Sequence, residues 1–157
     1  MKNKYFPEEE IDYNDLLFIC FMIEKVARSI HQPNRYVVNA IGCEEFVHLL
    51  SVAKALHCEN PLDVVDDWKE YYKLEYGQHD VTAVDAELCP HIPSALDMGK
   101  VYARLILQTL GTGEDYAQGV MRVYNDDICQ TLDNYSCSAY YEPSYYIAES
   151  YRAGGFF

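Results

Sequence analysis

Apolar residues recur at three- and four-residue spacing along most of this chain, which is the pattern of amphipathic helices. The longest such stretch predicts a helix over 12–31, in which Asp12 is the N-cap and Asp15 stands three residues later. Further apolar residues beside the stripe, such as Phe18 and Phe21, widen it beyond one face. We therefore expect this helix to lie at the centre of the fold, with neighbours on several sides.

Start and stop residues mark three more helices in the first half of the chain. Pro33 suits the first turn of a short helix, and Gly42 suits its C-terminal left-handed position. A third helix is predicted over 43–57 from its apolar spacing. A fourth is predicted over 60–76, because Asn60 is a good N-cap and a proline follows it.

Residues 78–92 show no sustained periodicity and indicate a loop, with 81–84 as a candidate for a short strand. After the loop, start signals predict three helices. Capping boxes of Ser94 with Asp97 and of Thr112 with Asp115 open helices over 94–110 and from Thr112 through about Tyr135, and Pro143 opens a short last one. The predicted fold is therefore all-α, a compact bundle of six or seven helices. We expect a single helical domain over 1–157, with the loop as the candidate joint between subdomains 1–77 and 93–157.

Half of the 157 residues are apolar, which suffices for the core of one domain. The apolar run over 16–23 is far shorter than the roughly 20 residues that a membrane span needs. Glutamates at 8–10 stand where a signal peptide has its apolar stretch. We therefore expect a soluble, cytoplasmic protein whose six cysteines are reduced.

Acidic residues outnumber basic ones by 25 to 12, which gives a net charge of −13. The excess is concentrated in two segments: 59–87 carries nine acids against two lysines, and 114–149 carries seven acids against one arginine. Such a surface repels phosphate and anionic lipid but attracts basic macromolecules from a distance. The sequence therefore predicts a basic protein partner, and it argues against direct binding to nucleic acid or to a membrane.

Two groups of residues are candidates for partner binding. The first lies on helix 60–76, opposite a predicted apolar stripe that contains Leu62, Val65 and Trp68. The second lies in the C-terminal segment, where aromatic residues are as dense as at the centres of contact surfaces. The candidate residues are Asp63, Asp66, Asp67 and Glu70 in the first group, and Tyr140, Tyr141, Tyr145 and Tyr146 in the second. The alternatives are a solvated helix face for the acids and packing of the tyrosines on their own domain.

Metal or acid–base chemistry has two weaker candidates. The residue types of the first set bind zinc, but they lack the usual two-to-four-residue gap between ligands. The acids of the second set fall within or near a predicted helix, where a solvated face accounts for them. The sets are His57, Cys58, Cys89 and His91, and Asp126, Asp127 and Asp133. Without a Gly-x-Ser-x-Gly motif or a phosphate-binding loop, we predict no catalytic residues, no metal and no cofactor.

Several short motifs in 16–72 resemble sequence features of a known protein family. They are the run Leu17–Glu24, Gly42, Leu56-His57, Asp66-Asp67, and Tyr71 or Tyr72. Together they resemble an uncharacterised family of short helical bacterial proteins. That family opens with Phe-x-x-x-Cys-Ile-Glu, whereas here Cys20 stands four residues before Glu24. Some members are encoded beside ADP-ribosyltransferase-like toxins, so the resemblance implies an antitoxin or accessory role.

The function predicted from the sequence is a non-catalytic acidic module that binds and inhibits a basic protein. The partner would be a nuclease, a nucleic-acid-binding protein or a toxin, and the carboxylates would stand where nucleic acid binds. The alternatives are a small helical metal-assisted enzyme and a structural adaptor subunit. The enzyme requires one of the two candidate sets above to converge in a pocket.

Overall fold

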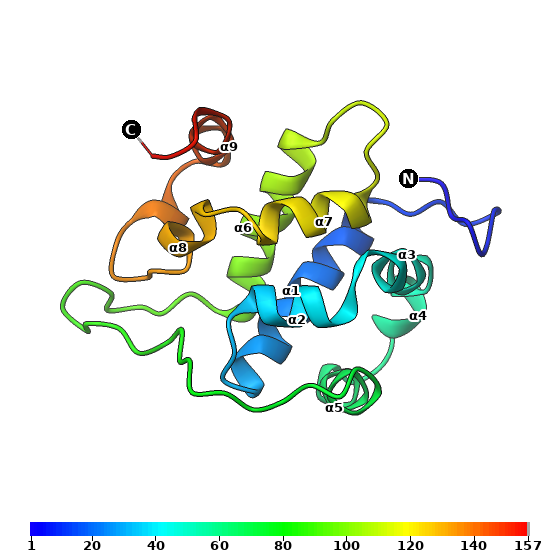
Figure 1. Cartoon of the computed structure of the whole chain (residues 1–157), viewed down its shortest axis with the longest axis horizontal. Helices are drawn as coiled ribbons and strands as arrows, with labels where there is room; N and C mark the ends of the chain where they lie inside the picture. The colour runs from blue at the N-terminus through cyan, green and yellow to red at the C-terminus, as the bar shows by residue number, and fades with distance from the viewer. Residues whose placement is uncertain (157) are drawn as a thin grey trace.

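The structure, a computed structural model, describes residues 1–156, which fold into helices joined by turns and loops (Figure 1). The helices are α1 (Tyr13–Ser29), α2 (Asn34–Ile41), α3 (Cys43–Ser51), α4 (Ala53–Leu56), α5 (Pro61–Tyr71), α6 (Ala95–Thr109), α7 (Tyr116–Tyr124), α8 (Ile128–Leu132), the 3-10 helix η1 (Ala139–Tyr141) and α9 (Ser144–Ala153). No strand occurs among the described residues, which confirms the predicted all-α fold. The α-helices of this region number nine instead of six or seven, because two predicted helices are broken.

Helices α1 and α6 form the centre of the fold and share the most extensive contact between two helices. Gly99 of α6 permits their close approach, because a Cβ atom there would lie 2.8 Å from the Cα atom of Phe21 in α1. Helices α2 and α7 contact each other and the central pair, while α3, α4 and α5 lie on one side of it and α8 and α9 on the other (Figure 1). One hydrophobic core therefore contains residues from both sides of the 72–94 segment.

The predicted central position of the first helix is confirmed. Leu16 and Met22 of α1 have no exposed surface, although they lie on different parts of the widened stripe. The predicted capping box also forms: Asp12 N donates to Asp15 Oδ2 at 2.9 Å, and Asp15 N donates to Asp12 Oδ1 at 3.1 Å. These bonds satisfy two backbone donors that a helix start otherwise leaves free.

The later helix starts follow the local signals with one exception. Asn60 caps α5, and Ser94 with Asp97 forms the predicted capping box of α6. The box predicted between residues 112 and 115 is wrong, because Asp115 is itself the N-cap and pairs with Gln118. The loop before α7 is therefore longer than predicted.

Tertiary and side-chain hydrogen bonds break two predicted helices. The helix predicted over 43–57 is interrupted at Val52, where the Asn3 side chain donates to the carbonyl oxygen of Ser51 at 3.2 Å. The helix predicted through Tyr135 is interrupted between α7 and α8, where Asp126 Oδ1 accepts from Ile128 N at 2.9 Å. Such side chains offer the backbone a partner that competes with the next helical turn.

The helix predicted over 60–76 ends early, at Tyr71. Lys73 takes a positive φ of 52°, and Leu74 N donates back to the carbonyl oxygen of Lys69 at 3.0 Å. This turn directs Leu74 into the core, where it is 9% exposed. Burial of Leu74 thus decides where α5 stops.

The 72–94 segment contains no helix, and the short strand considered at 81–84 does not form. It leaves α5 and runs along the lower edge of the view in Figure 1 before it enters α6. Within residues 1–156, no helix has the length and apolar character needed to cross a membrane.

Candidate functional site

The acids predicted to bind a partner lie together on the outer side of α5. Val64, Val65 and Trp68 are buried, so the positions opposite them face solvent. We call these opposite positions the acidic face, and they are Asp63, Asp66, Asp67 and Glu70, all exposed. Lys69 Nζ lies 4.0 Å from Asp66 Oδ1, but 74% of the Asp66 side chain is exposed, so this pair neutralises little of the charge.

Large apolar side chains border the acidic face, and the sequence pattern did not identify them. Leu62 was expected in the buried stripe, but it is 62% exposed because Val64 takes the buried position instead. Tyr71, the last residue of α5, is 73% exposed. Its exposure depends on the early end of the helix, which the sequence did not reveal. Carboxylates flanked by an exposed leucine and an exposed tyrosine are a mixed surface of the kind that proteins use for contact.

The four candidate tyrosines lie on η1 and α9, across the molecule from α5 (Figure 1). Tyr141 and Tyr145 are strongly exposed, whereas Tyr146 is half-buried beside Phe156. Tyr140 is also half-buried, with its ring 5.4 Å from that of Tyr135. The tyrosines and the acidic face therefore do not form one continuous surface, and each must be considered separately.

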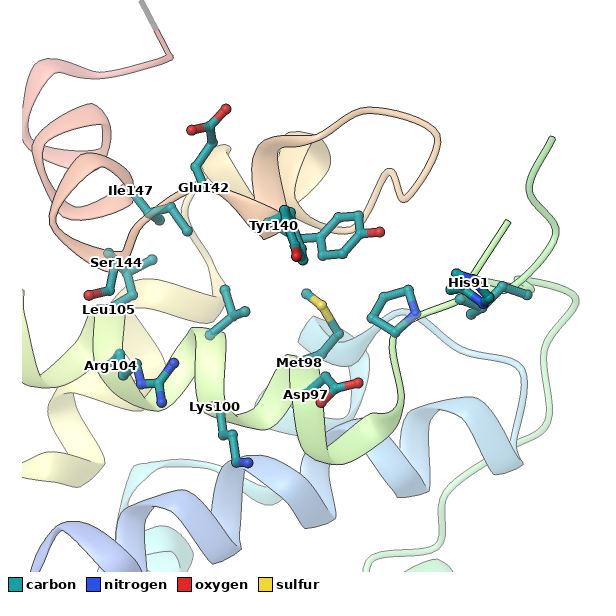
Figure 2. Close-up of a pocket in the computed structure, with 14 residues that line it drawn as sticks. His91, Asp97, Met98, Lys100, Arg104, Leu105, Tyr140, Glu142, Ser144 and Ile147 are labelled. Atoms are coloured by element: carbon teal, nitrogen blue, oxygen red, sulfur yellow. The ribbon is translucent and has the colours of Figure 1, made fainter. Parts of the chain in front are cut away.

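Tyr140 and Tyr141 border a cavity of about 450 Å³ between α6 and the start of α9. Figure 2 shows Met98 of α6 facing Tyr140 across this cavity, with Lys100 and Arg104 on the α6 side. No sequence pattern indicated the cavity, because its walls come from segments about forty residues apart.

The four histidine and cysteine candidates are not arranged as a zinc site. His57 stacks on Phe18 with 4.8 Å between ring centroids, and Cys58 Sγ donates to the carbonyl oxygen of Lys54 at 3.3 Å. Cys89 Sγ donates to the carbonyl oxygen of His91 at 3.4 Å. Across residues 1–156, no three His, Cys, Asp or Glu side chains are placed to hold a metal ion together. All six cysteines are free.

The three aspartates of the second set also have different environments in the structure. Asp126 Oδ1 accepts a hydrogen bond from Ile128 N at the start of α8, and Asp127 is exposed. Asp133 instead turns toward the core, where Asn34 Nδ2 donates to Asp133 Oδ2 at 3.0 Å and to Glu24 Oε1 at 3.1 Å. Tyr102 OH donates to the second oxygen of Asp133 at 2.7 Å. Two carboxyl groups are thus joined through one amide.

Glu24 is the member of this pair that the sequence did not identify, although a glutamate within the apolar stripe of α1 was an available signal. Burial raises the pKa of Glu24 to about 8, and the negative charge of Asp133 adds to the rise. Burial also raises the pKa of Asp133 to about 6, against the opposing hydrogen bonds from Tyr102 and Asn34. Near neutral pH the pair therefore holds a proton.

Comparison with known proteins supplies no relative for this chain: no family model matches it, and no curated protein or solved structure matches it either. Its function must therefore be argued from its own residues. The acidic face of α5 and the cavity beside Tyr140 are two surfaces with the chemistry to bind another molecule.

Proposed function

We propose that this protein is a non-catalytic, cytoplasmic module that binds a basic protein on the acidic face of α5 and inhibits it. The observation that supports this proposal is the arrangement of α5 itself. Four exposed carboxylates share one side of the helix, and exposed Leu62 and Tyr71 border them. Charge alone would serve solubility, whereas the apolar border adds side chains that can be buried by a partner.

The surrounding charge extends the attraction beyond α5. The 59–87 segment, with nine acids against two lysines, continues from α5 along the same edge of the molecule (Figure 1). Complementary charge of this kind raises association rates by roughly 10–10³-fold. The effect is screened by salt, because the Debye length is only about 8 Å at physiological ionic strength.

The spacing of the acids favours a partner that normally binds nucleic acid. At about 1.5 Å per residue, the seven steps from Asp63 to Glu70 span about 10 Å of helix axis and carry four charges. The mean separation of about 3.5 Å is close to the roughly 3.4 Å per phosphate along one DNA strand. A nuclease, a nucleic-acid-binding protein or a toxin with a cationic cleft is the expected partner. The resemblance of 16–72 to proteins encoded beside toxins agrees with the last of these.

Affinity capture from native lysate at about 50 mM and about 500 mM salt, followed by mass spectrometry, tests the proposal. The test variant carries amides at the acidic face: Asp63→Asn, Asp66→Asn, Asp67→Asn and Glu70→Gln. A matched control removes four exposed acids elsewhere: Glu8→Gln, Glu9→Gln, Glu10→Gln and Glu149→Gln. Both variants lose the same net charge, so a difference between them isolates the position of the acids.

We expect the wild type and the control to capture the same basic protein at low salt, and the α5 variant to lose it. Inhibition of the captured protein's activity by added wild-type protein then separates an inhibitor from an adaptor. Trp68, the single tryptophan, is buried on the inner side of α5, so its fluorescence reports whether that helix is intact in each variant. Equal capture by both variants with an unchanged Trp68 signal would rule out the acidic face as the binding surface.

A further inference from the structure

The cavity beside Tyr140 has the walls of a small-molecule site. Its apolar lining includes Met98, Val101 and Leu105 from α6 and Ile147 from α9. Tyr140 closes one side with an aromatic ring, as Figure 2 shows. A volume of about 450 Å³ falls within the roughly 300–1,000 Å³ typical of ligand pockets.

Two cations at the edge of this cavity have no ion-pair partner among residues 1–156. Lys100 and Arg104 stand one helical turn apart on α6, and neither lies within 4.0 Å of a carboxylate in the part of the chain that the structure describes. Like charges at this spacing destabilise a helix by a few tenths of a kcal/mol. Two neighbouring unpaired cations are therefore unexpected in a protein with 25 acids and 12 basic residues.

Neither carboxylate that lines the cavity lies within 4.0 Å of these cations, although the hydrogen bond from Ser94 N lowers the pKa of Asp97 and the charge of Lys100 adds to this. Asp97 accepts a hydrogen bond from Ser94 N at 3.0 Å and so serves the start of α6. In Figure 2, Glu142 points away from the α6 side, toward the opposite edge of the cavity. The cavity thus combines an apolar interior with two cations on its α6 side: Arg104, and Lys100, whose ammonium group points below α6 and away from Tyr140 in Figure 2.

We infer that this cavity binds a small organic anion with an apolar body, such as an amphipathic carboxylate. The apolar body would contact Met98, Leu105 and Ile147, and the anionic group would pair with Lys100 and Arg104. Among side-chain groups, the guanidinium of arginine and the ammonium of lysine bind carboxylates and related oxyanions most strongly. The net charge of −13 repels an anion in proportion to its charge, which favours a singly charged ligand over a polyanion. This inference is independent of the function proposed for α5.

A pair of dyes that differ by one charge tests the inference. The probes are 8-anilinonaphthalene-1-sulfonate and the neutral N-phenyl-1-naphthylamine, titrated against the full chain by fluorescence, with stoichiometry from calorimetry. The wild type should bind the sulfonate at one site, about tenfold more tightly than the neutral dye. The double variant Lys100→Gln with Arg104→Gln should lose that tenfold preference and bind the neutral dye as before.

Two further variants locate the site. Val101→Trp fills the cavity and should weaken both dyes, since Val101 is a half-buried wall residue. Lys2→Gln with Lys4→Gln removes the same charge beside a different cavity, of about 870 Å³, and should leave sulfonate binding unchanged. Loss of binding in the Lys2 and Lys4 variant, or an unchanged sulfonate preference in the Lys100 and Arg104 variant, would overturn the inference.

Discussion

Replacing Glu24 with glutamine should remove a pH dependence from the stability of this protein. Glu24 is 3% exposed, and burial holds its pKa at about 8 instead of the ordinary 4.5. Glutamine has nearly the same shape and keeps the oxygen that accepts the hydrogen bond from Asn34, so packing should change little. The substitution therefore isolates the ionisation of one buried group.

The direction in which stability changes with pH follows from the number of protons bound by the folded and the unfolded states. Above about pH 4.5 the unfolded chain loses the Glu24 proton, while the folded chain keeps it up to about pH 8. Since the folded state then binds about one more proton, the free energy of unfolding falls by about 1.4 kcal/mol per pH unit. This loss of stability from ionising the buried Glu24 carboxyl is absent below about pH 4.5 and complete above about pH 8. Between about pH 6.5 and 8, above the range in which Asp133 adds its own contribution, the wild type should lose about 2 kcal/mol.

Urea denaturation followed through Trp68 fluorescence measures this loss at several pH values. The wild type should show the decline, whereas Glu24→Gln should be nearly flat over the same range. Glu149→Gln, an exposed carboxylate on α9, is the matched control and should decline like the wild type. Parallel curves for the wild type and Glu24→Gln would show that the buried pair does not hold the extra proton.

Two further predictions concern packing and an ion pair. Gly99→Ala should cost about 1–3 kcal/mol of stability, because its Cβ would lie 2.8 Å from the α1 backbone, whereas Gly155→Ala meets no atom within 4 Å. Equal denaturation midpoints for these two variants would contradict the close approach of α1 and α6. Arg122→Gln should cost about 1–3 kcal/mol, because the partly buried guanidinium donates to both oxygens of Glu114, at 2.7 and 2.9 Å. Arg104, which is exposed and forms no ion pair within residues 1–156, is the control. Arg104→Gln should change the unfolding free energy by less than about 0.5 kcal/mol, and a larger change than for Arg122→Gln would refute the reasoning.

The candidate sites were predictable only in part. The exposure of Asp63 and its neighbours followed from the apolar residues on the other side of the same helix, which is a local relation. The exposure of Leu62 did not follow, because two valines in a row left the centre of the buried stripe ambiguous. The pairing of Glu24 with Asp133 joins residues about 110 positions apart, and periodicity carries no information on such contacts.

Local sequence patterns were enough to predict the helical class, the central position of α1 and the capping boxes of α1 and α6. These features depend on side chains within a few residues of one another, so a short stretch of sequence is enough to predict them. Tertiary packing set where helices break, as at Ser51, whose carbonyl oxygen accepts a hydrogen bond from the Asn3 side chain. It also placed the candidate tyrosines away from α5 and brought α6 and α9 together around a cavity, because such arrangements depend on how the helices pack and not on the order of residues along any one of them.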